Sequence, residues 1–210
     1  KTKFTDDYDL NTFDYTKLKG STSMVLPDAG YNPDDGVKLG LQFKSVSQGF
    51  ERNPFTSKHS IAGNYFFATQ GYELNYEGEF ANVIGNWNLG IDAVFNSPNF
   101  ARNFFGFGNN SQNPKAFTED EDRDFNRVRI GKTILGSSIK WRGKLGALIQ
   151  LSTKYQNFNV ERTPGRFLET QFNENNRVFS SQHFFNTSLG YHFKHEDNKG
   201  LPTLGFEFSS

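Results

Sequence analysis

This sequence lacks cysteine, net charge and long apolar runs, and each absence excludes a class of protein. With no cysteine among its 210 residues, it has neither disulfides nor thiolate zinc sites. Its 23 basic residues balance its 23 acidic ones, so no net charge draws it to nucleic acid. No apolar run approaches the roughly 20 residues of a transmembrane helix, and residues 1–7 lack a signal-peptide core. We therefore interpret the chain as mature or as part of something larger.

Aromatic side chains, in contrast, are abundant. The chain contains 24 Phe and 8 Tyr, and 16% of it is aromatic, although only 35% is hydrophobic and the mean hydropathy is -0.68. A chain that is rich in rings but hydrophilic on average suits a β-barrel with one apolar face better than a bundle of membrane helices.

Apolar and polar residues alternate with a period of two along most of the chain, which indicates β-strands. The clearest segment is 71–81, with an apolar and a polar face: Tyr72, Leu74, Tyr76 and Phe80 against Glu73, Asn75, Glu77 and Glu79. Turn signals such as Asn32-Pro33-Asp34-Asp35-Gly36 separate these segments. We predict a polar lead-in at 1–22 and strands at 23–32, 37–47, 58–69, 71–81, 87–96, 124–141, 145–158, 182–195 and from 203 onward.

One predicted strand, 124–141, changes the parity of its apolar residues part-way. Val128 and Ile130 lie at even positions, whereas Leu135, Ile139 and Trp141 lie at odd ones. An extra residue in a strand produces such a change, and we predict a β-bulge near residues 132–134.

The connections differ in length in a way that a barrel requires. The two longest, 97–123 and 159–181, are separated by two strands joined by a short turn at Arg142-Gly143-Lys144, so both should lie at the same end. We expect these two to be exposed outside the cell. The connection 47–57 falls at the opposite end, where it is longer than a periplasmic turn usually is.

The predicted fold class is all-β, an antiparallel transmembrane β-barrel over residues 23–210. The alternative is a soluble lipocalin-like barrel or sandwich, whose strands also alternate. Charges on one face and large rings on the other favour the membrane barrel, because rings face lipid and charges face a wet lumen. We assign seven charged residues to the lumen, where opposite charges should neutralise one another: Glu73, Glu77, Glu79, Asp92, Arg127, Arg129 and Lys154.

No catalytic, cofactor or metal site is predicted, and the chain is not expected to be an enzyme. No nucleophile or orienting histidine accompanies the lumen carboxylates in sequence. His59 and His183 are isolated, and His192 and His195, three apart, point to opposite faces of a strand. The acidic run at 119–124 lacks the glycine and the alternation of a calcium loop, so we interpret it as a solvated surface loop.

The first predicted strand contains Pro27, which has no N–H to donate to a ladder. This strand should therefore be an edge or a poorly paired strand, unless Pro27 belongs to a turn before it. A free strand edge can template pairing with another strand. We assign Pro27, Gly30 and Tyr31 to this weak first strand.

Three segments resemble the N-terminal half of the BamA/TamA superfamily barrel, also called the bacterial surface antigen domain. Residues 26–40 resemble its first hairpin, in which a Tyr and a Pro-acidic-Gly turn precede a Gly-bearing strand. Residues 124–129 resemble the start of an aromatic-x-Arg-Val-Arg strand. The sequence Phe-Phe-Gly-Phe-Gly-Asn resembles a loop common in these barrels, to which we assign Phe104, Phe105, Gly106, Gly108 and Asn109.

The resemblance covers about residues 24–210 and implies the first half of a sixteen-stranded barrel in the bacterial outer membrane. The implied function is the assembly, insertion or surface delivery of outer-membrane proteins, through a first strand that opens sideways. The implied partners are outer-membrane lipid, barrel strands from the same gene or a partner chain, and other outer-membrane proteins, with no nucleic acid and no cofactor.

Two alternative functions remain open from the sequence. Some relatives carry this barrel behind a calcineurin-like metallophosphoesterase domain, so the chain would be the membrane anchor of an enzyme. A small complete pore or adhesion barrel is the other. An open sheet in lipid leaves backbone groups unsatisfied at several kcal/mol each. We therefore expect the strand at 204–208 to pair with 182–195 and to have no second partner within this chain.

Overall fold

The computed structural model describes residues 20–49, 55–106, 108, 124–143, 147–173, 176–196 and 205–209. Within these residues one antiparallel sheet has the order β1-β2-β3-β4-β5-β7-β8-β9-β10, with the short β6 paired to β7. The strands are β1 (Thr22–Asn32), β2 (Gly36–Ser47), β3 (Ser57–Phe66), β4 (Gly71–Ile84), β5 (Trp87–Asn96), β6 (Ala101–Asn103), β7 (Arg127–Arg142), β8 (Ala147–Glu161), β9 (Gln182–Glu196) and β10 (Gly205–Ser209). The prediction of an all-β antiparallel fold is confirmed.

Most predicted strands agree with the structure within a few residues, because turn-forming residues determine the strand ends through local contacts. In the first turn, the backbone N–H of Asp34 donates to Asn32 Oδ1 at 3.0 Å, and Gly36 has a φ of 77°. The short elements β6, α3 (Phe167–Gln171) and η1 (Arg177–Phe179) were not predicted. A segment of three to five residues is too short for a period to emerge.

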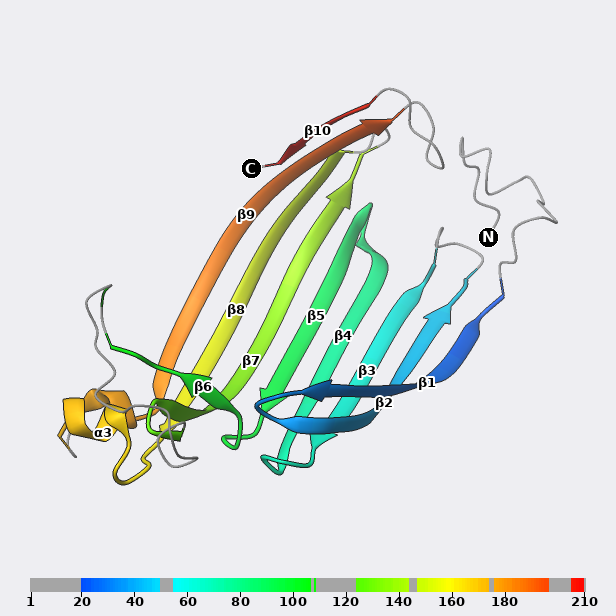
Figure 1. The fold of residues 1–210 in the computed structure, drawn as a ribbon. Coiled ribbons are helices and arrows are strands. Elements are labelled where there is room, and N and C mark those ends of the chain that lie inside the picture. Colours follow the sequence, from blue (N-terminus) through cyan, green and yellow to red (C-terminus); the bar gives the residue numbers. More distant parts are fainter. Residues whose placement is uncertain are drawn as a thin grey trace, which may run out of the picture.

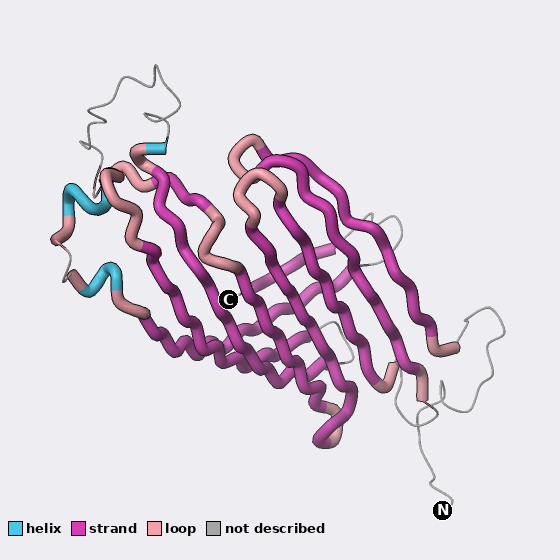
Figure 2. Tube along the Cα trace, turned by 90° about the horizontal axis from the view of Figure 1, so that it is seen from below, coloured by secondary structure: helices cyan, strands magenta, loops and turns pink. Residues whose placement is uncertain are grey.

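The sheet is a single layer that curves along its length (Figures 1 and 2). Both long connections, β5 to β7 and β8 to β9, lie at the same end as the β1–β2 and β3–β4 turns, as the sequence predicted (Figure 1). We call this the loop end. The β2–β3 connection lies at the opposite end, also as predicted. No helix within the described residues is long and apolar enough to cross a membrane.

Cross-strand partners share a face, and over the middle of the sheet the two faces differ in their predominant chemistry. One face, the polar face, carries Lys38, Gln42, Lys44, Lys58, Ser60, Asn64, Glu73, Asn75, Glu77, Glu79, Asn88, Asp92, Ser138, Lys140, Gln150, Ser152 and Lys154. The other, the apolar face, carries Leu39, Leu41, Ile61, Tyr65, Tyr72, Leu74, Phe80, Trp87, Leu89, Ile91, Phe95, Leu135, Ile139, Trp141, Leu151, Tyr155, Phe185 and Leu189.

The apolar face is largely exposed among the described residues. Leu41, Leu74 and Leu189 expose 61%, 54% and 74% of their surface. Among the described residues only five apolar side chains are buried: Phe55, Phe66, Ala81, Val128 and Leu168. A water-soluble domain buries its apolar side chains in a core, and exposed apolar patches mark contact with another apolar phase or partner.

The predicted bulge near residues 132–134 is wrong. The pairing of β7 runs unbroken along both neighbours, from Asn96↔Lys132 to Trp87↔Trp141 and from Arg129↔Glu161 to Arg142↔Leu148. The irregularity lies instead in β4, between Phe80 and Ile84, where Asn82 has a φ of 51°.

The parity change in β7 has a different cause, which is that both faces are partly covered at the loop end. Val128, Ile130 and Ile134 belong to the polar face by register, and Val128 is only 5% exposed. Near the loops this face becomes apolar without any slip of the strand.

The strand order has two free ends among the described residues. β10 pairs with β9 and not with β1, as we expected, and β1 pairs with β2. β1 is an edge strand, in keeping with the prediction from Pro27, which pairs with Leu41 in an otherwise continuous register.

Continuous pairing of β7 predicts which engineered cysteines meet. Thr133 and Asn157 are direct partners, so Thr133→Cys with Asn157→Cys should form a disulfide on oxidation, measured by mobility before and after reduction. The natural absence of cysteine removes competing thiols. Thr133→Cys with Phe158→Cys is the control, because these positions lie on opposite faces. Preferential cross-linking of the control pair would show that the pairing is shifted by one residue and would support a bulge near residues 132–134.

Candidate functional site

The polar face contains a hollow of about 590 Å³, lined by residues from β2 to β8 that include Lys44, Lys58, Glu77, Asp92 and Lys154. A hollow against six neighbouring strands of one layer requires the sheet to bend toward that side. The polar face is therefore the concave one and the apolar face the convex one. The hollow is the candidate functional site.

One ion pair inside the hollow joins two strands that are not neighbours. Lys154 Nζ on β8 lies 3.6 Å from Asp92 Oδ2 on β5, although β7 runs between them. The intervening residue is Gly136, the direct partner of both Asp92 and Lys154. A Cβ atom at Gly136 would overlap both carboxylate oxygens of Asp92, so a larger residue here would force Asp92 to move.

A second cluster surrounds Glu79 at the end away from the loops. Its carboxylate lies 3.9 Å from Lys140 Nζ and 3.6 Å from Arg142 Nη2, and it accepts a 2.7 Å hydrogen bond from Asn88 Nδ2. Glu79 is only 19% exposed, so this charge is held by three donors in a partly desolvated place.

The remaining charges of this face are paired less uniformly. Glu73 accepts a 2.8 Å hydrogen bond from Asn64 Nδ2, and Lys38 pairs with Asp28 at 2.9 Å near the edge. Lys58 Nζ lies 4.1 Å from the Phe55 ring centroid. Glu77 lines the hollow between these groups. The structure thus brings Glu73, Glu77, Glu79, Asp92 and Lys154 to one face, as the sequence predicted.

Two predicted lumen residues, Arg127 and Arg129, do not line this hollow. The unbroken register gives both the parity of Leu135 and Ile139, and both lie at the loop end of β7. Arg129 lies 3.7 Å from Glu161, its partner on β8. Arg127 contacts Asp124 at 2.7 Å and Asp34 at 2.9 Å. The error follows from the missing bulge, because a one-residue shift would have moved both to the other face.

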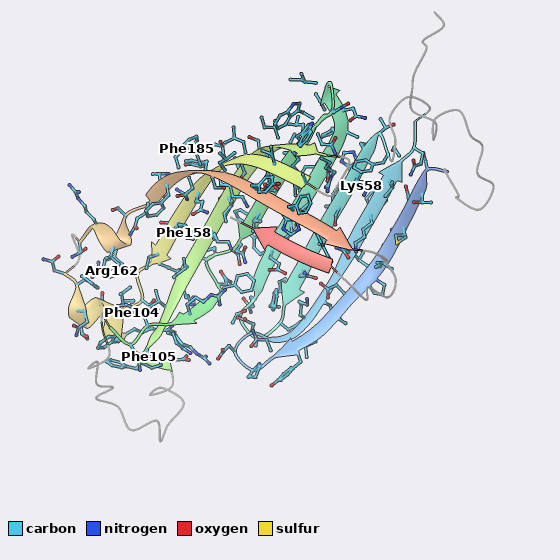
Figure 3. The ribbon with its side chains drawn as sticks, turned by 90° about the horizontal axis from the view of Figure 1, so that it is seen from above. Lys58, Phe104, Phe105, Phe158, Arg162 and Phe185 are labelled. Carbon is cyan, nitrogen blue, oxygen red and sulfur yellow. The ribbon has the colours of Figure 1, made fainter. Side chains whose placement is uncertain are left out.

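The predicted loop motif lies beside the helix of the other long connection. Phe104 and Phe125 both pack against Phe167 of α3, with centroids 6.0 and 5.8 Å away. Gly106 and Gly108 have φ values of 102° and 99°, which favour glycine. Phe105 is 48% exposed, and Asn109 lies outside the described residues, as do positions 119–123 of the acidic run. Figure 3 shows Phe104, Phe105 and Arg162 at one end of the sheet and Lys58 toward the other.

The predicted weak first strand lies at the edge, largely in solvent. Tyr31 is 74% exposed and pairs with Val37. Gly30 pairs with Lys38, whose Cε lies 3.5 Å from where a Cβ on Gly30 would stand.

The sequence reasoning missed two tyrosine–histidine pairs on the convex face. Tyr76 Oη lies 3.1 Å from His59 Nδ1 away from the loops, and Tyr155 Oη lies 2.7 Å from His183 Nδ1 near them. Within each pair the rings are stacked, with centroids 6.2 and 5.9 Å apart. The only sequence signal was that each histidine lies in an apolar-face position of its strand.

The chemistry of the hollow is that of a solvated, charge-lined wall. No group of three or more His, Cys, Asp or Glu among the described residues is arranged to hold a metal ion. The carboxylates are held by cations and amides rather than by an orienting histidine and a nucleophile. No protein-family model and no curated protein matches this chain.

The three-strand ion pair predicts a strong dependence on Gly136. Gly136→Ala should lower the free energy of unfolding by about 1–3 kcal/mol in a denaturant titration, because the added methyl collides with Asp92. Gly131→Ala on the same strand is the control, since its Cβ would meet Pro98 at an ordinary 3.5 Å. In an Asp92→Ala background the cost of Gly136→Ala should disappear. A cost that persists there would disprove the collision.

Proposed function

We propose that this chain forms part of the wall of a transmembrane β-barrel in the bacterial outer membrane, of the BamA/TamA type, and takes part in assembly or surface delivery of outer-membrane proteins. The observation that carries the proposal is the division of one curved sheet into an exposed apolar convex face and a charged concave face. This division is the reverse of a lipocalin-like soluble barrel, whose apolar side chains fill the interior.

The convex face also has the layered composition that a bilayer demands. Along β4 and β5, aromatic rings stand at both ends, Tyr72 and Phe80 on β4 and Phe95 and Trp87 on β5. Leu74 and Ile91 lie between them, and so does one further ring, Tyr76 on β4. Aromatic rings favour the level of the lipid head groups, and aliphatic chains favour the hydrocarbon.

The spacing of these rings is somewhat shorter than the apolar band of an outer-membrane barrel. Tyr72 and Phe80 are eight positions apart on one strand. At a rise of roughly 3.3 Å per residue they stand about 26 Å apart, and a strand tilted by about 40° converts this to about 20 Å of height. The apolar band of such barrels is about 25 Å tall.

The edge strand supports the assembly role in particular. β1 is exposed along most of its length and, among the described residues, is paired on one side alone. In lipid a free edge must find partner strands, from the rest of the barrel or from a client protein. A barrel that serves as the membrane anchor of a metallophosphoesterase would share the same wall but would not exchange strands at β1.

The lipid-facing assignment predicts opposite responses at adjacent positions. Leu74→Arg should destabilise the protein folded in bilayers by about 2–4 kcal/mol, because arginine near the midplane of the lipid is costly. Asn75→Arg, one residue along on the concave face, should cost much less. The measurement is a denaturant titration of the full-length protein in phospholipid vesicles. Equal costs at both positions would rule out a membrane wall.

The assembly role predicts selective capture at the edge strand. A photo-cross-linking amino acid at Val25 on β1 should capture nascent outer-membrane proteins in living cells. The matched control is Leu41 on the interior strand β2, because both residues lie on the apolar face and both are 61% exposed. Capture at neither position, with the protein folded in the membrane, would favour the anchoring role.

A further inference from the structure

The β1–β2 hairpin stays hydrogen-bonded to β3 up to its tip, where it curves strongly. It bends and passes across the lower ends of β3, β4 and β5 in Figure 1. The backbone N–H groups of Phe67 and Ala68 donate to the Val37 and Asp35 carbonyls at 3.0 and 3.2 Å, which extends the β2–β3 ladder to the turn. Gly36 allows this approach, because a Cβ there would lie 2.6 Å from the Ala68 methyl.

One side chain joins this tip to the middle of the sheet. Arg127 Nη2 donates to Asp34 Oδ1 at 2.9 Å, although 93 residues separate them in sequence. The same guanidinium donates through Nη1 to Asp124 Oδ1 at 2.7 Å. Arg127 opens β7, and three strands stand between β2 and β7 in the sheet. The contact therefore spans the sheet at its loop end rather than following the backbone ladder.

The contacts continue from Arg127 into the second long connection. Arg166, just before α3, lies 3.7 Å from the other oxygen of Asp124 and donates to the Arg127 carbonyl at 3.2 Å. The Phe167 N–H donates to the Phe125 carbonyl at 2.8 Å. Asp34, Arg127, Asp124 and Arg166 thus alternate in charge from the edge hairpin to the β8–β9 connection.

The turn at the tip of the hairpin is also partly buried. Asp35 is only 8% exposed and accepts a 2.8 Å hydrogen bond from Asn32 Nδ2. Burial, aided by the neighbouring Asp34 charge, raises the pKa of Asp35 above its ordinary value.

We infer that the β1–β2 tip is a latch, in which Arg127 fastens the edge hairpin to the start of β7 and couples it to the long β8–β9 connection. Release of Asp34 from Arg127 loosens the tip of the hairpin at the loop end, while the β2–β3 ladder still holds β2 in the sheet. The pair is partly exposed, with Arg127 at 27% and Asp34 at 49%, so it is a reversible and salt-sensitive fastening. The inference concerns the sheet itself and holds whether or not the barrel assembles other proteins.

The test is hydrogen exchange of backbone amides in the full-length protein, folded in its membrane or detergent, for single variants. Arg127→Gln and Asp34→Asn should each speed exchange in residues 22–47 about two- to five-fold, because both remove the fastening. Arg129→Gln is the matched control. It removes an ion pair with Glu161 two positions along the same strand but leaves the tip untouched. It should not change exchange in residues 22–47.

A double variant and a second control separate the latch from general destabilisation. Arg127→Gln combined with Asp34→Asn should exchange no faster than Arg127→Gln alone, since the two changes remove one contact. Asp124→Asn should speed exchange near α3 more than in residues 22–47. Should Arg127→Gln fail to fold, Asp34→Asn decides alone, because Asp34 lies in a turn. Unchanged exchange in Asp34→Asn, or equal loosening by Arg129→Gln, would overturn the latch.

Discussion

The unbroken backbone ladder from β2 to β9 is the constraint on which the rest of this structure depends. In a single-layer sheet, register alone decides which side each side chain faces, and a slip of one residue would exchange the two faces. Because pairing holds from Lys38 on β2 to His192 on β9, with one irregularity in β4, every strand contributes charge to the concave side and rings to the convex side. Backbone pairing thus produces the chemical separation that the proposed function needs.

Curvature imposes a second constraint, on the size of concave side chains. Bending toward the polar face brings long charged side chains together over the strands, and glycines make the room. Gly136 lies beneath Asp92, and Gly90 and Gly40 are close to Ser138 and Asn64 in the same way. Side chains that reach over a glycine can pair with charges two strands away, as Asp92 does with Lys154. This side therefore has a network of ion pairs, in a wet hollow where each is individually weak.

The loop end obeys different rules, and there the sequence was least informative. Alternation reports a face that meets water and a face that meets an apolar phase. At the start of β7 the concave side is covered, and it therefore carries the apolar residues Val128 and Ile130. In the sequence this looks like a shift of the apolar residues from one face to the other, although the strand is regular. Arg127 and Arg129 were misassigned for this reason. The partners that hold this region together are remote in sequence, such as Asp34 for Arg127 and Phe167 for Phe104, and no local pattern identifies such pairs.

By itself the sequence determined the all-β class, most strand positions, the end at which the long connections lie, and the face of Glu73, Glu77, Glu79, Asp92 and Lys154. These follow from period-two alternation and turn residues, which act over a few positions. Only the tertiary structure decided which face is concave, how Asp92 reaches Lys154 over Gly136, and where the first hairpin's tip rests. Each of these depends on the curvature of the whole sheet, which sums small twists over many strands and therefore leaves no signature in any one segment.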